Sequence, residues 1–194
     1  MRKGYDGIAE AYQASRSRFD HSKEMREFAG LLPVNARVLD VGCGTGVPVA
    51  RFLVDSGFVV VGIDFSENML RLARKNVPEA EFIKKDMTKL GFPPDSFDGV
   101  IALYSIIHVP RDRHSSLFDS FHRILKPGGI MLVCMGPDEW EATDEYLGTP
   151  MFWSHYSPEK SLQLVKDASF QIVSDQILVR GGEKHYWILA RNRK

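Results

Sequence analysis

The residues of this chain that are best suited to bind a ligand lie in a glycine-rich turn. An acid, Asp40, precedes three alternate glycines, Gly42, Gly44 and Gly46. Glycines at this spacing leave one edge of the turn without Cβ atoms, so a ligand can approach the backbone closely. A helix that starts after such a turn also offers free N–H groups to the ligand. The turn therefore predicts a nucleotide-type binding site.

A second acid, Asp64, stands 22 residues after Gly42, at the end of an apolar run. Nucleotide-binding folds place an acid at about this offset, where its carboxylate can accept hydrogen bonds from both ribose hydroxyls. The alternative role of Asp64 is to cap the helix that follows, but Ser66 can serve as that cap. We therefore expect Asp64 to bind a ribose.

The spacing of the glycines also separates two classes of nucleotide-binding fold. Dinucleotide-binding dehydrogenases use Gly-x-Gly-x-x-Gly. This chain has Val47 where that pattern requires its third glycine, because Gly46 comes one residue early. The compact spacing therefore disfavours a nicotinamide dehydrogenase.

Strands and helices that alternate along the chain must position these residues. Apolar runs bounded by turn residues predict strands, and apolar residues at helical spacing predict helices. The expected strands are residues 37–41, 58–64, 80–85, 97–103, 130–135, 171–179 and 184–190. The expected helices are residues 47–55, 66–76, 112–125 and 158–168, with further helical cover in residues 1–30. This alternation predicts an α/β domain with a parallel sheet, followed by a final antiparallel hairpin.

Length and composition are those of an ordinary soluble domain. The chain has 194 residues, of which 44% are hydrophobic and 26% charged. Basic and acidic residues number 25 each, so the formal net charge of zero does not predict binding to nucleic acid or to an anionic membrane. We find no apolar run of the roughly 20 residues that span a membrane. We also expect no signal peptide and no disulfide framework. We expect one cytoplasmic domain, as a monomer or homodimer.

Residues Val38 to Gly46, Val-Leu-Asp-Val-Gly-Cys-Gly-Thr-Gly, resemble motif I of the class I S-adenosylmethionine-dependent methyltransferases over all nine positions. Residues 97–100 resemble motif IV, and Leu-Lys-Pro-Gly-Gly at 125–129 is another landmark of that family. The resemblance covers nearly all of residues 1–194 and implies a single domain. It implies a Rossmann-like, seven-stranded, mostly parallel sheet in the order 3-2-1-4-5-7-6, with helices on both faces and an antiparallel seventh strand.

The same resemblance implies S-adenosylmethionine as the cofactor and S-adenosylhomocysteine as the product. It places the adenine against Asp86 and the backbone N–H of Met87, although Asp86 could instead be a solvated loop residue. Tyr5 lies in a segment that resembles the N-terminal helix that closes over the cofactor, although its aromatic residues could serve only as anchors. The full set of expected cofactor-binding residues is Asp40, Gly42, Gly44, Gly46, Asp64, Phe65, Met69, Asp86, Met87, Leu103, Tyr5 and Tyr12.

The residues after the fourth strand favour a small-molecule acceptor. The chain lacks the Asn-Pro-Pro-Tyr or Asp-Pro-Pro-Tyr motif of amino-methylating nucleic-acid enzymes and the Pro-Cys nucleophile of cytosine C5 enzymes. Tyr104 stands where catechol-type enzymes have a metal-binding acid, so we expect no metal. The alternatives are a protein or RNA acceptor and a non-catalytic cofactor-binding module.

Residues 136–157 break the α/β pattern with a run of aromatic and acidic residues. Open α/β folds bind substrate at the carboxyl edge of the sheet, so we expect this insertion and the N-terminal helix to form a lid over the acceptor. The expected acceptor contacts are Trp140, Trp153, Tyr156 and Tyr104. If the five acids of the insertion face the pocket, they favour a cationic acceptor; otherwise they are solvated and only the aromatic residues line it.

Catalysis of methyl transfer depends mainly on alignment of the reactants. If the acceptor is a hydroxyl or an ammonium group, a base that titrates near neutral pH also helps. His108, after the fourth strand, and His155, in the insertion, are the candidates, with a purely structural role as the alternative. His114 and His122 are eight residues apart, too far to share a metal ion, and we expect both on the surface.

Overall fold

The fold is that of a computed structural model, which describes Tyr5, Gly7, Ile8 and residues 20–194. Its sheet contains seven strands, β1 (Arg37–Val41), β2 (Val59–Asp64), β3 (Glu81–Lys84), β4 (Phe97–Ala102), β5 (Leu125–Met135), β8 (Phe170–Arg180) and β9 (Glu183–Asn192). Their order is β3-β2-β1-β4-β5-β9-β8. Strand β1 pairs in parallel with β2 and β4, and β9 is antiparallel to β5 and β8. The predicted sheet order is confirmed, with β8 and β9 as its sixth and seventh strands.

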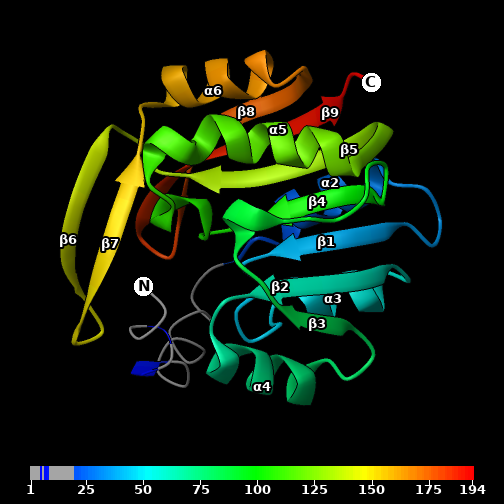
Figure 1. Cartoon of the computed structure of the whole chain (residues 1–194), viewed down its shortest axis with the longest axis horizontal. Coiled ribbons are helices and arrows are strands. Elements are labelled where there is room, and N and C mark those ends of the chain that lie inside the picture. The colour runs from blue at the N-terminus through cyan, green and yellow to red at the C-terminus, as the bar shows by residue number, and fades with distance from the viewer. Residues whose placement is uncertain (1–4, 6, 9–19) are drawn as a thin grey trace.

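Within the described residues, five α-helices cover the two faces and one edge of this sheet. They are α2 (Ser22–Gly30), α3 (Val49–Asp55), α4 (Glu67–Asn76), α5 (His114–Ile124) and α6 (Pro158–Asp167). Figure 1 shows α5 and α6 on one face and α2 and α3 on the other. Phe118 and Phe121 of α5 are fully buried in one core cluster, and Phe28 of α2 and Leu53 of α3 are fully buried in a second. The helices therefore bury one apolar face each, as amphipathic helices do.

Two helices begin at the serine caps that the sequence predicts. The Ser66 hydroxyl accepts a hydrogen bond from the Met69 N–H, 3.2 Å away, and opens α4. The Ser157 hydroxyl accepts from the Lys160 N–H, and Pro158 stands at the first turn of α6. Because Ser66 caps α4, the carboxylate of Asp64 is not needed for that purpose.

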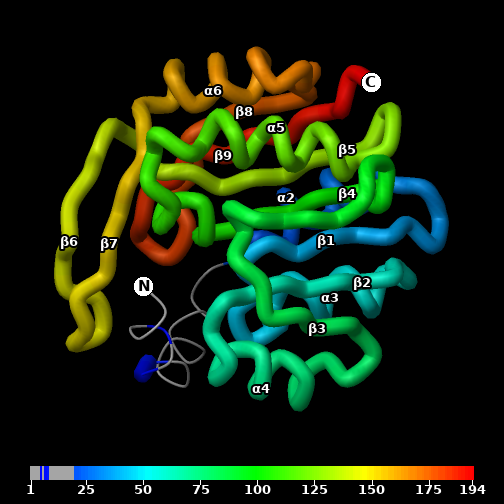
Figure 2. The backbone as a smooth tube through the Cα atoms, viewed as in Figure 1, coloured from blue at the N-terminus to red at the C-terminus, as the bar shows by residue number. Residues whose placement is uncertain are grey.

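Two segments differ from the sequence-based expectation. Residues 126–129, which lie outside the expected strand 130–135, belong to β5, where the pairing with β4 shifts from Phe97 opposite Leu125 to Gly99 opposite Ile130. Residues 136–157, for which no regular structure is predicted, contain a second sheet, the hairpin of β6 (Trp140–Tyr146) and β7 (Thr149–His155). Figure 2 shows this hairpin beyond the carboxyl ends of β4 and β5, apart from the main sheet.

The prediction that His114 lies on the surface is wrong. Its side chain is buried at the start of α5, and its Nε2–H donates to the Val109 carbonyl, 3.0 Å away. Burial lowers the pKa of His114, because the charged imidazolium loses its hydration there. His114 therefore fixes the loop before α5, whereas His122 is half-buried near the other end of the helix.

The expected helical cover of residues 1–30 is described only in part. Helix α2 forms as expected, and Tyr5 and Ile8 are buried. No helix in the part of the chain that the structure describes is both long enough and apolar enough to cross a membrane.

Candidate functional site

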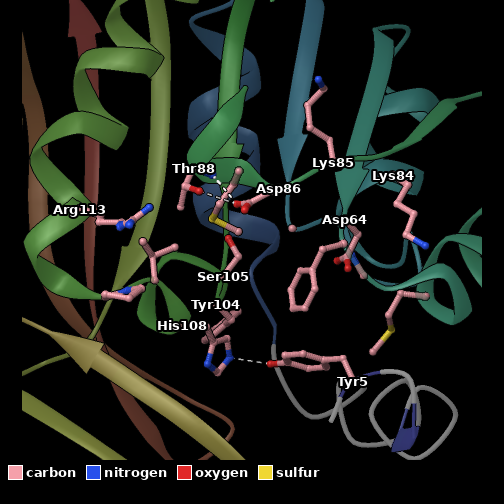
Figure 3. Close-up of a pocket in the computed structure, with 17 residues that line it drawn as sticks. Tyr5, Asp64, Lys84, Lys85, Asp86, Thr88, Tyr104, Ser105, His108 and Arg113 are labelled. Carbon is pink, nitrogen blue, oxygen red and sulfur yellow. Dashed lines mark hydrogen bonds between the residues drawn. The ribbon is translucent and has the colours of Figure 1, made fainter. Parts of the chain in front are cut away.

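A cavity of about 600 Å³ opens at the carboxyl edge of the main sheet, beside the glycine turn. Figure 3 shows residues from both halves of the fold around it. Its lining includes Gly42, Gly44, Asp64 and Asp86, and also Tyr5, Tyr104, His108 and Arg113. Its volume and its mixed polar and aromatic walls are typical of small-ligand sites.

The glycine turn forms the floor of this cavity because its first glycine has no side chain. Gly42 has a φ of +74°, and a Cβ atom there would lie 2.3 Å from the Cβ of Ser105. Ser105 is held in place because its hydroxyl donates to the Val41 carbonyl, 2.7 Å away. Gly46 is needed for a different reason, since its Cβ would press against Val77 and Phe82 in the core. Gly46 does not line the cavity.

Asp64 connects the glycine turn to the start of α4. Its Oδ2 accepts a hydrogen bond from the Gly44 N–H at 3.0 Å, and its Oδ1 accepts from the Ser66 N–H at 2.8 Å. These bonds hold the carboxylate rigidly at the wall of the cavity. Phe65 and Met69, from the same segment, line the cavity beside it.

Asp86 and Met87 follow β3 and line the next part of the wall. Asp86 Oδ1 accepts from the N–H and the hydroxyl of Thr88, each 2.8 Å away, and so caps the short helix η1 (Met87–Lys89). The side chain of Asp86 is exposed, which leaves its carboxylate accessible from the cavity. The geometry suits the expected adenine contact and includes a local capping role as well.

Asp40 is a buried acid, and its Oδ2 has no hydrogen-bond partner among the described residues. Burial, together with the negative charge of Asp64, raises the pKa of Asp40 to about 8. The residue borders a small second cavity of about 40 Å³, next to Gly42, Gly44 and Leu103. A buried acid without a partner at a ligand cavity indicates a missing hydrogen-bond donor, such as an ammonium group.

Tyr104 lines both cavities, as Gly42 and Gly44 do. It has a φ of +56°, a left-handed conformation that is rare for a bulky residue and is concentrated at functional sites. Its ring packs edge-on against His185, with the ring centres 4.6 Å apart, and its hydroxyl lies 3.5 Å from His21 Nδ1. Buried residues just before α2 and in β9 thus hold Tyr104 in place.

His108, at the end of the short helix η2 (Ile106–His108), lines the cavity. Its Nδ1 lies 2.8 Å from the Phe152 carbonyl, and its Nε2 lies 2.6 Å from the Tyr5 hydroxyl. The ring of Trp153 packs against the imidazole, with the ring centres 4.5 Å apart. His108 is thus fixed from three sides, by the N-terminal segment and by two residues of β7.

The hairpin β6–β7 is hydrogen-bonded to the segment that carries His108. The buried Ser154 hydroxyl accepts from the Arg111 N–H, 2.8 Å away, and donates to the Glu141 carboxylate at 2.7 Å. The Arg111 guanidinium in turn pairs with Glu139 at 2.8 Å and with Glu141 at 3.6 Å. Two of the five acids of the insertion therefore neutralise Arg111, and none of the five lines the cavity.

The remaining predicted acceptor contacts lie away from the cavity wall. Trp140 is half exposed on β6, and Trp153 reaches the site only through His108. Tyr156 packs against Arg111, whose guanidinium carbon lies 5.4 Å from the ring centre. His155 is buried, and its Nδ1 bonds to the Asp138 carbonyl at the base of the hairpin. Tyr12 lies outside the described residues.

Several cavity residues were missed by sequence reasoning. Ser105 follows Tyr104 directly, and its position after the fourth strand was the available signal. Thr88 could have been found from its place beside Met87. Arg113 and Pro110 carry no motif, because only the path of the loop after His108 brings them to the cavity.

Comparison with known proteins agrees with this geometry. The sequence profile of a family described as a methyltransferase domain matches residues 38–129. YqeM of Bacillus subtilis, which is named as a methyltransferase, is 28% identical over 93% of this chain and 78% of its own length. The demethylmenaquinone methyltransferase of Clavibacter sepedonicus is 40% identical, but the match covers only 50% of this chain and 40% of the relative.

A solved structure supports the same assignment. The SAM-dependent methyltransferase of Methanosarcina mazei superposes with a TM-score of 0.73 at 25% identity, covering 84% of this chain and 95% of its own. The glycine turn, the acids after β2 and β3 and the orphaned carboxylate of Asp40 fit the polar groups of S-adenosylmethionine. The chain therefore belongs to the class I S-adenosylmethionine-dependent methyltransferases and is an enzyme that uses this cofactor as its methyl donor.

Proposed function

We propose that the enzyme methylates a small molecule that binds in the same cavity as the cofactor. The observation that carries this proposal is the mixed lining of the cavity of about 600 Å³, which has room for more than a few polar contacts to one group. Acids and backbone groups suited to a nucleoside line it together with aromatic and basic side chains. The demethylmenaquinone relative, which is named for a small-molecule substrate, supports this reading.

Several residues of the two cavities have a matching group in S-adenosylmethionine. Asp64 suits the ribose hydroxyls, Asp86 and Met87 suit the adenine, and Asp40 suits the ammonium group. Bound S-adenosylmethionine supplies an electrophilic methyl group on a sulfonium centre. The protein then needs chiefly to align the acceptor and to exclude water, and alignment alone can lower the barrier by about 7–11 kcal/mol.

On the acceptor side, an apolar cluster joins three separate parts of the chain. Tyr5 and Ile8 of the N-terminal segment, Met69 of α4 and Met151 of β7 are all buried in it. This cluster connects the cofactor side of the cavity to the hairpin, which supports the expectation that the N-terminal segment and residues 136–157 together close the site. Such closure excludes water and strengthens electrostatic interactions within the site.

The charges at the site favour a neutral or anionic acceptor over a cationic one. Glu139 and Glu141 pair with Arg111 and do not line the cavity. Arg113 does line it, and in Figure 3 its guanidinium extends toward the middle of the cavity. This arrangement supports the alternative that the acids of the insertion do not bind the acceptor.

A screen of a metabolite library tests the proposal, with release of S-adenosylhomocysteine as the signal and mass spectrometry of the methylated product as confirmation. A parallel reaction with labelled methyl donor, total RNA and a protein extract measures transfer to macromolecules. We expect label in a low-molecular-weight product. Label confined to RNA or protein, or tight cofactor binding without turnover on any acceptor, would contradict the proposal.

A further inference from the structure

The protonation state of His108 follows from its hydrogen bonds. The partner of Nδ1 is the Phe152 carbonyl, which can only accept a hydrogen bond, so Nδ1 must carry the proton. A neutral imidazole has one proton, which leaves Nε2 with its lone pair. The Tyr5 hydroxyl, 2.6 Å from Nε2, therefore donates to it. A backbone carbonyl of β7 thus selects the tautomer that presents a base to the cavity.

The position of this pair suits a reaction with a bound acceptor. Both Tyr5 and His108 line the cavity, as Figure 3 shows, and Tyr5 is only 8% exposed. Trp153 covers one face of the imidazole, and Ser154 of the β6–β7 hairpin holds the backbone three residues after it, at Arg111. The imidazole ring therefore cannot turn over without breaking the bond to Phe152.

We propose that Tyr5 and His108 form a proton relay for an acceptor with a weakly acidic hydroxyl group, such as a phenol or an enol. This inference rests on the proposed function and specifies its substrate class. The acceptor hydroxyl hydrogen-bonds to the Tyr5 oxygen. Its proton passes to Tyr5 while the proton of Tyr5 passes to Nε2 of His108.

The step balances in atoms and charge. The oxygen lone pair of the acceptor forms the new bond to the methyl carbon, and the S–C bond breaks with its electron pair returning to sulfur. The positive charge lost from sulfur reappears on the imidazolium of His108, whose Nδ1–H still donates to the Phe152 carbonyl. The product is a neutral methyl ether.

The chemistry of the relay selects a hydroxyl acceptor. A phenol acceptor carries the same ionising group as a tyrosine side chain, so the relay passes a proton between two oxygens of the same kind. A hydroxyl must lose its proton as it is methylated, because the protonated ether is a very strong acid. A thiol ionises unaided closer to neutrality, at a pKa of about 8.5. An amine can release its proton to water after the transfer.

Two experiments on the full-length protein test the relay. The first is heteronuclear NMR of histidine-labelled protein bound to S-adenosylhomocysteine, with the His108 signals assigned by their loss in His108→Asn. We expect a protonated Nδ1, an unprotonated Nε2, and a shift of the Nε2 signal in Tyr5→Phe but not in Tyr186→Phe, which removes a hydroxyl bonded to Asp175. A proton on Nε2 would overturn the proposal, and this measurement needs no acceptor.

The second experiment uses the acceptor that the metabolite screen returns. We expect His108→Gly to lower kcat about 100- to 10,000-fold, with cofactor affinity unchanged and with partial rescue by free imidazole. His122→Gln, on the far part of α5, is the matched control and should have normal kcat. A screen that returns only amine acceptors, or a His108→Gly variant with normal kcat, overturns the relay. Cofactor binding and methyl transfer by the wild type would still support the proposed function.

Discussion

At the scale of single residues, Gly42 is the position of the site where an added side chain would clash most closely with a neighbour. Gly42→Ala adds a Cβ that would lie 2.3 Å from Ser105, in a left-handed conformation. Gly57→Ala is a matched control, because Gly57 also has a positive φ, +82°, but open space around its Cβ position. We expect Gly57→Ala to cost about 1–2 kcal/mol in the free energy of unfolding, and Gly42→Ala about 1–3 kcal/mol more. Urea denaturation measures both, and equal losses would contradict the steric argument.

Asp40 couples cofactor binding to the release of a proton. Its pKa of about 8 in the free protein means that the carboxyl group is largely protonated at neutral pH. A cationic group bound beside it favours the carboxylate and lowers that pKa, so binding should release up to about one proton near pH 7. Calorimetric titration in buffers of different ionisation heat measures this release. In Asp40→Asn the release should vanish, and an unchanged value would show that Asp40 does not meet the cofactor.

At the scale of elements, the β6–β7 hairpin braces the acceptor side of the cavity through Ser154. Ser154→Ala leaves the Arg111 N–H and the Glu141 carboxylate without their shared partner. Loss of such a buried hydrogen bond costs about 1–3 kcal/mol, so the Arg111 amide should exchange with solvent about tenfold faster or more. Thr143→Ala, on the exposed face of β6, is the control. If Ser154→Ala leaves the exchange of the Arg111 amide unchanged, the hairpin does not brace this loop.

The elements also differ in how far the sequence predicts them. The central strands and the glycine turn were predictable because their signals are local: apolar runs, glycine spacing and the Ser66 and Ser157 caps. The hairpin was not predicted, because residues 140–155 contain no strong turn signal that would divide them into two strands. The burial of His114 was also missed, because its partner is a carbonyl in the preceding loop and leaves no pattern in the sequence.

The same limit applies to the candidate site. The residues of the cofactor side lie in or directly after short sequence motifs, so Gly42, Asp64, Asp86 and Met87 could be named in advance. All four line the cavity. The acceptor side is assembled from the N-terminal segment, the loop after β4 and the hairpin, which only the tertiary fold brings together. For that reason His108 was a candidate without a partner, and its bond to Tyr5 could not be foreseen.

At the scale of the whole molecule, the buried His114 makes stability depend on pH. Its folded-state pKa lies below the ordinary value of 6.5, so the unfolded chain binds the proton more tightly. The free energy of unfolding should therefore fall as pH drops below about 6.5, and His114 contributes no such loss above it. Urea denaturation of the wild type and of His114→Gln at about pH 7.5 and pH 5.5 should show a smaller loss in the variant. An equal loss in both would contradict this role.

The central claim is that the cavity beside the glycine turn holds S-adenosylmethionine, with Asp64 as its main polar anchor. Calorimetric titration of S-adenosylhomocysteine into the wild type, Asp64→Asn and the control Asp55→Asn tests it most directly. Asp55 is exposed and pairs only with Arg51 among the described residues. Charge-assisted hydrogen bonds contribute about 1.5–3 kcal/mol each, so the loss of two should weaken binding about a hundredfold or more in Asp64→Asn. Asp55→Asn should bind like the wild type. Equal affinity in all three proteins would contradict the placement of the cofactor in this cavity.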